Sequence, residues 1–196
     1  GYKFRWVALV FCALMIFLGV DLWGGSFWSP YQRVDLKHKK DTIAILANGF
    51  YISSVSTLPL KQVPAEQRKL HALPFSSLQK DDRILILGSG AGSADVREAV
   101  AANATARITA VEIDPIFVEI GKNIDPDKTY LTPRVHSHIE DARRFLTKSK
   151  DKFNVIYYPF LDSQTNASSV ARFRLDSFLY TKEGFRSAWD HLSPDG

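Results

Sequence analysis

Three glycines at alternate positions form the part of this sequence that most directly indicates chemistry. Gly88, Gly90 and Gly92 lie in the segment LILGSGAGSADVREAV, residues 85–100, between an apolar run and a stretch of helical character. This pattern is typical of a strand that turns sharply into a helix, where glycine lets the backbone approach a bound nucleotide closely. The spacing is GxGxG, because Ser93 stands where the dinucleotide fingerprint places its third glycine. The glycines alone therefore leave the ligand open.

Acidic residues end the next two predicted strands. Glu112, in AVEIDP, lies twenty residues beyond Gly92, where a carboxylate can accept hydrogen bonds from both hydroxyls of a ribose. Asp141, in IEDARRFL, can accept one from an adenine amino group. Either acid alone is explained equally well as a cap or a first-turn charge of a helix. The glycine turn and the two acids together, at three successive strand ends, favour an adenosine site.

The elements that position these residues begin near residue 81, where strands and helices start to alternate. Such alternation predicts an α/β fold with a parallel sheet covered on both faces. We expect strands over residues 83–87, 107–113, 135–139 and 153–158, and helices over 95–102, 116–123, 142–149 and 182–192.

A small β-rich unit is predicted before this region. Residues 42–46 and 50–55 are rich in strand-forming side chains and flank Asn48-Gly49, a strong signal for a tight hairpin turn. Residues 58–77 contain three prolines and are predicted to mix short helix with loop.

Composition narrows the function classes. The chain has 196 residues, of which 45% are hydrophobic and 23% charged, as in globular proteins. A net charge of +4 does not by itself indicate a nucleic-acid partner. Cys12 is the single cysteine, which excludes a disulfide framework and a cysteine-based metal site. His136 and His138 share a strand face but lack a third ligand, so we expect no metal.

An apolar segment near the start predicts a membrane helix within residues 1–24. Residues 6–20, WVALVFCALMIFLGV, carry no charge, and extension to Trp23 places a tryptophan at each end. A signal peptide and a buried core helix are the alternatives. The positive-inside rule places the following domain in the cytoplasm, although an ordinary solvated strand face would carry the same charges. The basic residues concerned are Arg33, Lys37, Lys39 and Lys40.

Several segments together resemble a known family. They are residues 82–100, 110–115, 133–146 and 152–158, together with SPYQR at residues 29–33. In combination they resemble the class I S-adenosylmethionine-dependent methyltransferase fold, and more closely spermidine synthase. The chain is similar in particular to membrane-fused bacterial spermidine synthase-like proteins, over residues 29–196.

The resemblance implies a donor site and an architecture. It implies a Rossmann-like transferase domain over residues 79–196, after a β-rich unit and connector over residues 25–78. Three further strands would follow the last residue, so the strand at residues 153–158 is expected at a sheet edge. Pairing into a homodimer is also implied. The implied ligand is S-adenosylmethionine or its decarboxylated form, held by Gln32 at the thioether region, the turn with Gly88, Gly90 and Gly92, Glu112 at the ribose, and Asp141 with Ala142 at the adenine.

The acceptor side departs from the family pattern. An ammonium with a pKa of about 10.4 must lose a proton before its nitrogen can attack, so a base is required. Pro159 stands where the family loop has the aspartate taken as this base, and only the second aspartate remains, as Asp162. Ala91 replaces an acid of the family turn. Asp162 and His71, which titrates near neutrality, are therefore the catalytic candidates.

Three functions follow from these observations. The favoured one is a membrane-anchored transferase that moves an aminopropyl or methyl group to an unidentified acceptor, an amine or another nucleophile. The second is a catalytically inactive sensor of an adenosine ligand. An NAD-dependent enzyme is disfavoured by Ser93 and by the lack of a recognisable second catalytic domain.

Overall fold

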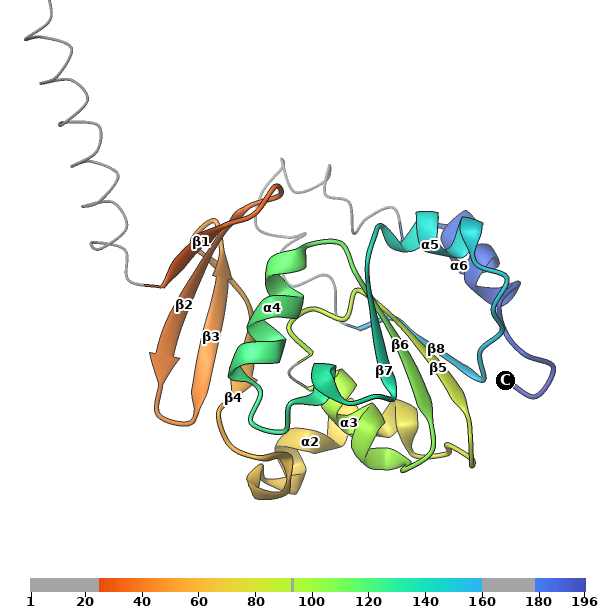
Figure 1. Ribbon diagram of the computed structural model, residues 1–196, viewed down its shortest axis with the longest axis horizontal. Coiled ribbons are helices and arrows are strands. Elements are labelled where there is room, and N and C mark those ends of the chain that lie inside the picture. Colours follow the sequence, from red (N-terminus) through yellow and green to blue (C-terminus); the bar gives the residue numbers. More distant parts are fainter. Residues whose placement is uncertain (1–24, 93, 160–178) are drawn as a thin grey trace, which may run out of the picture.

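The computed structural model describes residues 25–92, 94–159 and 179–196. These ranges form two sheets that lie side by side, one antiparallel and one parallel (Figure 1). The predicted membrane span at residues 6–23 lies outside them. Among the helices within these ranges, none has the length and apolar character needed to cross a bilayer.

The N-terminal sheet is larger than the predicted hairpin. The hairpin itself is confirmed, since Asn48 and Gly49 both have positive φ, at 50° and 85°, as its two-residue turn requires. Two earlier strands extend it. One has only three residues, and the charged residues of the other, RVDLKHK, interrupt the alternation on which strand prediction relies. In spatial order the strands are β1 (Ser26–Trp28), β2 (Arg33–Lys39), β3 (Thr42–Ala47) and β4 (Phe50–Ser56).

The connector mixes short helices with loop, as predicted. Pro59 and Pro64 each stand directly before a helix, because proline cannot donate a backbone hydrogen bond and suits helix starts. The helices are η1 (Leu60–Gln62), α2 (Ala65–Ala72) and η2 (Leu73–Phe75).

The parallel sheet confirms the predicted alternation of strands and helices. Its strands lie in the order β7-β6-β5-β8, so β8 lies at an edge within the part of the chain that the structure describes. The strands are β5 (Arg83–Leu87), β6 (Arg107–Glu112), β7 (Val135–Ile139) and β8 (Val155–Tyr157). The helices are α3 (Asp95–Ala102), α4 (Pro115–Ile124), η3 (Thr129–Leu131), α5 (Ala142–Lys148) and α6 (Lys182–Trp189).

Helices cover both faces of the parallel sheet. Alternate residues of a strand point to opposite faces, so Ile84 and Ile86 pack toward α3 and α4, while Leu85 and Leu87 pack toward α5 and α6. All four side chains are fully buried. Figure 1 shows α3 and α4 on one side of the sheet and α5 and α6 on the other.

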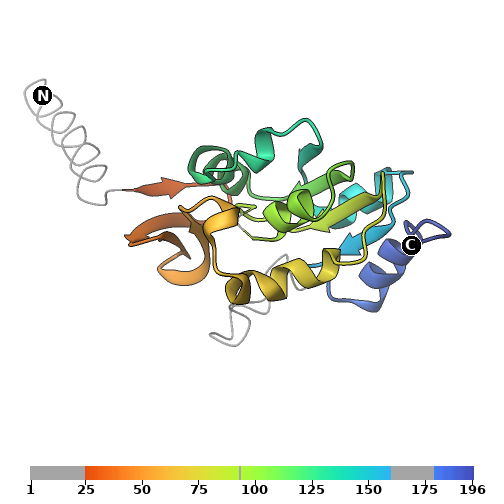
Figure 2. The same cartoon turned by 90° about the horizontal axis from the view of Figure 1, so that it is seen from below.

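A third apolar cluster joins the two sheets. Val34, Ile45 and Val55 of the N-terminal sheet contact Ala91 in the glycine turn and Phe117 in α4. Both views place the N-terminal sheet beside α4 rather than over a face of the parallel sheet (Figure 1 and Figure 2). This packing brings the segment at residues 29–33 to the start of α4.

Candidate functional site

The glycine turn leaves β5 at the carboxyl edge of the parallel sheet. The backbone N–H groups of Gly88 and Ser89 donate to the carbonyl oxygen of Val111 at 2.8 and 3.0 Å, which fastens the turn to β6. Gly90 and Gly92 have φ angles of 57° and 62°, which residues with a Cβ adopt at a cost. The sharp turn predicted from the glycine spacing is therefore confirmed.

Glu112 is the last residue of β6 and its carboxylate faces the glycine turn. Only 5% of the residue is exposed. Its Oε2 accepts the Gly90 N–H at 2.7 Å and its Oε1 accepts the Asp114 N–H at 3.0 Å. Burial raises the pKa of the Glu112 carboxyl above its usual value, and these backbone donors partly oppose the shift. Each oxygen retains acceptor capacity for a ligand hydroxyl, so the ribose contact stays a prediction that this geometry permits.

Asp114 connects Glu112 to the N-terminal sheet. Its Oδ1 accepts the Ile116 N–H at 3.1 Å and caps α4, while its Oδ2 accepts from Ser29 Oγ at 2.7 Å and Gln32 Nε2 at 3.3 Å. Asp114 is not among the residues predicted from the sequence, although an aspartate followed by proline is a recognisable helix start. Asp114 thus contacts both Gln32 and Glu112, and the thioether contact of Gln32 stays a prediction.

The side chain of Tyr130 packs against the glycine turn. Its Oη lies 2.8 Å from both the Gly90 carbonyl oxygen and Ser89 Oγ. Burial raises the pKa of its phenol well above the usual value, so the ring acts as a neutral hydrogen-bond donor. A Cβ added to Gly92 would lie 2.3 Å from Tyr130 Cε2, which shows how closely the ring fills this space. No local signal in the sequence points to this tyrosine.

Asp141 caps the helix that follows the next strand. Its Oδ1 accepts the Arg144 N–H at 2.9 Å at the start of α5, and Ala142 beside it is buried. The Glu140 N–H donates to the Glu112 carbonyl at 3.0 Å, so this helix start lies one strand away from the Glu112 carboxylate. Asp141 is therefore a helix cap, which is one of its two predicted roles. The other role, contact with an adenine, stays a prediction.

A second polar cluster lies on the β8 side of the glycine turn. His71 Nδ1 of α2 is 2.8 Å from Asp95 Oδ1, in the first turn of α3. Tyr157, the last residue of β8, donates its hydroxyl to the same oxygen at 3.2 Å. The hydrogen bond with Asp95 raises the pKa of His71 above its usual value, against the effect of burial. The sequence singled out His71 but not Asp95.

An ion pair fixes the helix that carries His71. Arg68 binds Glu98 through two hydrogen bonds of 2.6 and 2.8 Å, which tie α2 to α3. The Glu98 side chain is 4% exposed, so the pair is better protected from water than a surface ion pair. This second link between the helices fixes the position of the His71 backbone.

The predicted catalytic residue Asp162 lies outside the residues that the structure describes. Pro159, three residues earlier, is buried, and its carbonyl oxygen accepts a hydrogen bond from Tyr180 Oη at 3.0 Å. Proline has no side-chain group that can exchange a proton. Residue 159 itself therefore supplies no group for acid–base chemistry.

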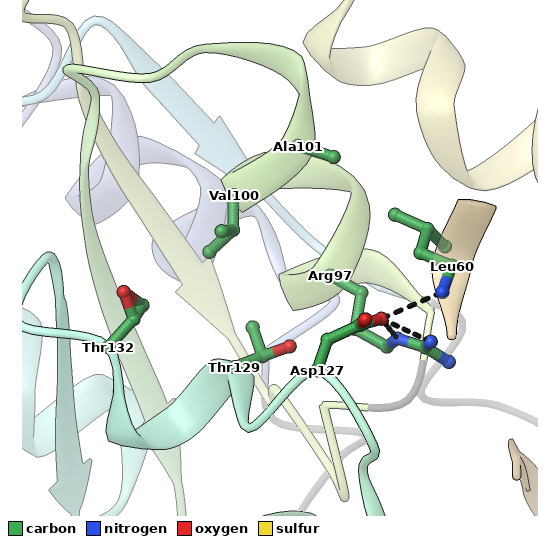
Figure 3. Close-up of a pocket in the computed structure, with 7 residues that line it drawn as sticks. All are labelled: Leu60, Arg97, Val100, Ala101, Asp127, Thr129 and Thr132. Atoms are coloured by element: carbon green, nitrogen blue, oxygen red, sulfur yellow. Dashed lines mark hydrogen bonds and ion pairs between the residues drawn. The ribbon is translucent and has the colours of Figure 1, made fainter. Parts of the chain in front are cut away.

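A shallow hollow of about 230 Å³ lies apart from these groups, toward the end of α3 (Figure 3). It is smaller than the usual range of about 300–1,000 Å³ for ligand pockets. Its carboxylate, Asp127, already accepts from Arg97 and from the Leu60 N–H at 2.8 Å. The charged groups in the hollow thus bind one another, and the glycine turn remains the better site.

The fold and the arrangement at this edge define a Rossmann-like α/β domain. Ligands of such open parallel sheets bind at the carboxyl ends of the strands. A family model for the spermine/spermidine synthase domain matches residues 63–196. Because this match spans more than half of the chain, the protein belongs to the spermine/spermidine synthase domain family. The resemblance to spermidine synthase seen in the sequence is thereby confirmed.

Curated relatives carry the corresponding names. Polyamine aminopropyltransferase 2 of Bacillus anthracis is 28% identical over 173 residues, covering 86% of this chain and 44% of the relative. Polyamine aminopropyltransferase of Sulfolobus acidocaldarius is 29% identical over 129 residues, covering 61% of this chain and 38% of the relative. Both relatives are transferases by name. At coverages of 44% and 38%, the chain spans less than half the length of these relatives.

Solved structures share the fold. A spermidine synthase in complex with the transition state analogue AdoDATO has a TM-score of 0.65 at 19% identity, covering 86% of this chain and 54% of that one. Spermidine synthase from Thermotoga maritima has a TM-score of 0.61 at 19% identity, covering 86% and 53%. At this identity the likeness supports the architecture of the two sheets.

Proposed function

We propose that this chain forms the donor-binding part of an aminopropyltransferase that uses decarboxylated S-adenosylmethionine and an amine acceptor. The observation that carries the proposal is the buried carboxylate of Glu112. It is held between the N–H groups of Gly90 and Asp114 at the point where a parallel sheet binds its ligand. A carboxylate in this position can accept hydrogen bonds from the two hydroxyls of a ribose.

The chemistry would need little beyond positioning and one proton transfer. The sulfonium of the donor is already activated, so an amine nitrogen held in line with the carbon–sulfur bond can displace the neutral thioether. Gln32 contacts Asp114 at the start of α4, a position from which it can reach the sulfur-bearing part of the donor. Asp162 and His71 are the proposed groups on the acceptor side.

The proposal is tested by titrating the full-length protein with decarboxylated S-adenosylmethionine, S-adenosylmethionine and NAD in a calorimeter. We expect the decarboxylated sulfonium to bind most tightly, and incubation with a set of diamines to yield an aminopropylated product detectable by mass spectrometry. Tighter binding of S-adenosylmethionine would favour methyl transfer. Binding without product would favour the sensor alternative, and binding of NAD alone would overturn both.

Attachment to a membrane through residues 6–23 is a separate prediction from the sequence. If it holds, the full-length protein stays with the membrane pellet after alkaline carbonate extraction, and a variant that lacks residues 1–24 is released. The predicted homodimer is tested independently by light scattering of the purified protein. Neither result bears on donor binding.

A further inference from the structure

We propose that His71 accepts the proton of the incoming ammonium, and that Asp95 and Tyr157 are positioning residues for its imidazole ring. This proposal rests on the proposed function, because it assigns the acceptor side of the same site. The substrate class that it implies is a primary alkylammonium, which must become a free amine before it attacks the donor.

The hydrogen bond between His71 and Asp95 leaves the other ring nitrogen available. Nδ1 of His71 bonds to Asp95 Oδ1 at 2.8 Å, which favours the tautomer with its proton on Nδ1 and a lone pair on Nε2. The His71 side chain is 30% exposed, so a small ligand can reach it. Within the described ranges Nε2 has no hydrogen-bond partner. A carboxylate that orients an imidazole in this way is the arrangement of an efficient general base.

Tyr157 holds the carboxylate in place. Its hydroxyl donates to Asp95 Oδ1 at 3.2 Å, and its ring packs edge-on against Phe75 with the ring centroids 5.3 Å apart. The Asp95 side chain is 15% exposed, so water competes little for these bonds. The three polar side chains come from α2, α3 and β8, so the packing of these elements alone creates the cluster.

The cluster lies where the acceptor would meet the donor. Asp95 follows the glycine turn after β5, and Tyr157 ends β8, which pairs with β5 on the side opposite β6. Glu112, at the end of β6, marks the side assigned to the ribose. A donor anchored there can extend its sulfur-bearing tail past the turn toward His71.

The proposed step balances in protons and electrons. The ammonium gives one proton to His71 Nε2, and the freed amine forms a carbon–nitrogen bond to the aminopropyl carbon. The carbon–sulfur bond breaks, and its electron pair stays on sulfur as the neutral thioether. The product nitrogen becomes a secondary ammonium, and the imidazolium releases its proton to water. This route supplies the proton acceptor that Pro159 cannot provide.

Four ionisable groups determine the pH range of this step. Asp95 raises the pKa of His71 through its hydrogen bond, and Glu98 raises it through its charge, which Arg68 largely neutralises. Tyr157 contacts Asp95 and not His71 itself. Burial raises the pKa of its phenol above the usual value, so the phenol stays uncharged at neutral pH. The ring is therefore protonated to higher pH than the usual 6.5. Turnover should fall as the pH decreases through this raised value, because the imidazolium cannot accept a proton.

Variants of the full-length protein test the assignment. We expect H71Q to lower kcat roughly 10²–10⁴-fold, the usual size of a general-base contribution, with the Kd for the donor unchanged within about twofold. We expect D95N to lower kcat and to move the acid limb of the pH profile toward 6.5, because the hydrogen bond that raises the pKa is weakened. The matched control is H38Q, which replaces an exposed histidine of β2 and should behave like the wild type.

The outcomes separate this proposal from the proposed function. An H71Q variant with wild-type kcat and an unchanged acid limb would overturn the assignment while leaving the aminopropyltransferase function intact. A loss of donor binding in H71Q would also overturn it, because His71 would then be needed for the structure of the donor site and not for proton transfer. An NMR titration of the His71 ring gives a readout that needs no turnover. A pKa that is equal in wild type and D95N would refute the positioning role of Asp95.

Discussion

Replacing Gly92 by alanine tests whether Tyr130 determines the shape of the glycine turn. At Gly92, φ is +62° and an added Cβ would lie 2.3 Å from Tyr130 Cε2. At Gly90, φ is +57° and an added Cβ would have nothing within 4 Å. The two alanine variants therefore share the backbone cost and differ in the clash with the tyrosine ring.

The expected magnitudes follow from these two contributions. A residue with a Cβ in the left-handed region costs about 1–2 kcal/mol, and overpacking of a filled site adds about 1–3 kcal/mol. We therefore expect G90A to lower the free energy of unfolding by about 1–2 kcal/mol, and G92A to lower it by about 2–5 kcal/mol. Since domains of this size are stable by only about 5–15 kcal/mol, G92A should be severely destabilised.

Urea unfolding followed by far-ultraviolet circular dichroism measures both variants. The matched control adds Y130L to each background, because leucine removes the ring that the new Cβ meets. We expect Y130L to recover about 1–3 kcal/mol in G92A relative to its effect in G90A. Equal destabilisation by G90A and G92A, or an absence of coupling with Y130L, would show that the ring does not constrain the turn.

Three further predictions concern ligand binding and buried charge. E112Q should weaken donor binding by about 10–100-fold in calorimetry, because a hydrogen bond to a charged acceptor contributes about 1.5–3 kcal/mol, and unchanged affinity would refute the ribose role. R97M should lower the free energy of unfolding by about 3–5 kcal/mol in urea titrations, because it leaves the buried Asp125 without its cationic partner, and a neutral effect would contradict the ion pair. D141S should keep the cap of α5 but weaken donor binding by about 2–10-fold through the lost adenine contact. If D141S binds normally while D141A loses about 1 kcal/mol of stability, Asp141 acts only as a helix cap.

Local patterns in the sequence were sufficient for the parallel sheet. The bounds of β5, α3 and β7 coincide with those predicted. The buried strand β5 is a short apolar run in the sequence, and glycine marks the turn between this strand and α3. Asn48-Gly49 likewise encodes its own hairpin. By contrast, β1 was missed because it is only three residues long. For β2, which carries charged side chains on its exposed half, a solvated strand face was considered only as an alternative.

The candidate site likewise contains some residues that local sequence patterns predict and others that only long-range contacts define. Glu112 was predicted because it ends a recognisable strand at a set distance from the glycines. Asp114 acts through Ser29 and Gln32, more than eighty residues earlier in the chain. The local sequence around Asp114 shows the helix-cap pattern but gives no indication of these long-range contacts.

By itself, the sequence determined the turn, the strand ends and the residue types available for chemistry, because backbone conformation depends on neighbours along the chain. Only the tertiary structure decided which side chains act together. Tyr130 contacts the glycine turn, and Asp95 binds both His71 and Tyr157, only because elements far apart in the sequence pack together. Hydrogen bonds and close contacts between side chains depend on distances that arise only when these elements assemble.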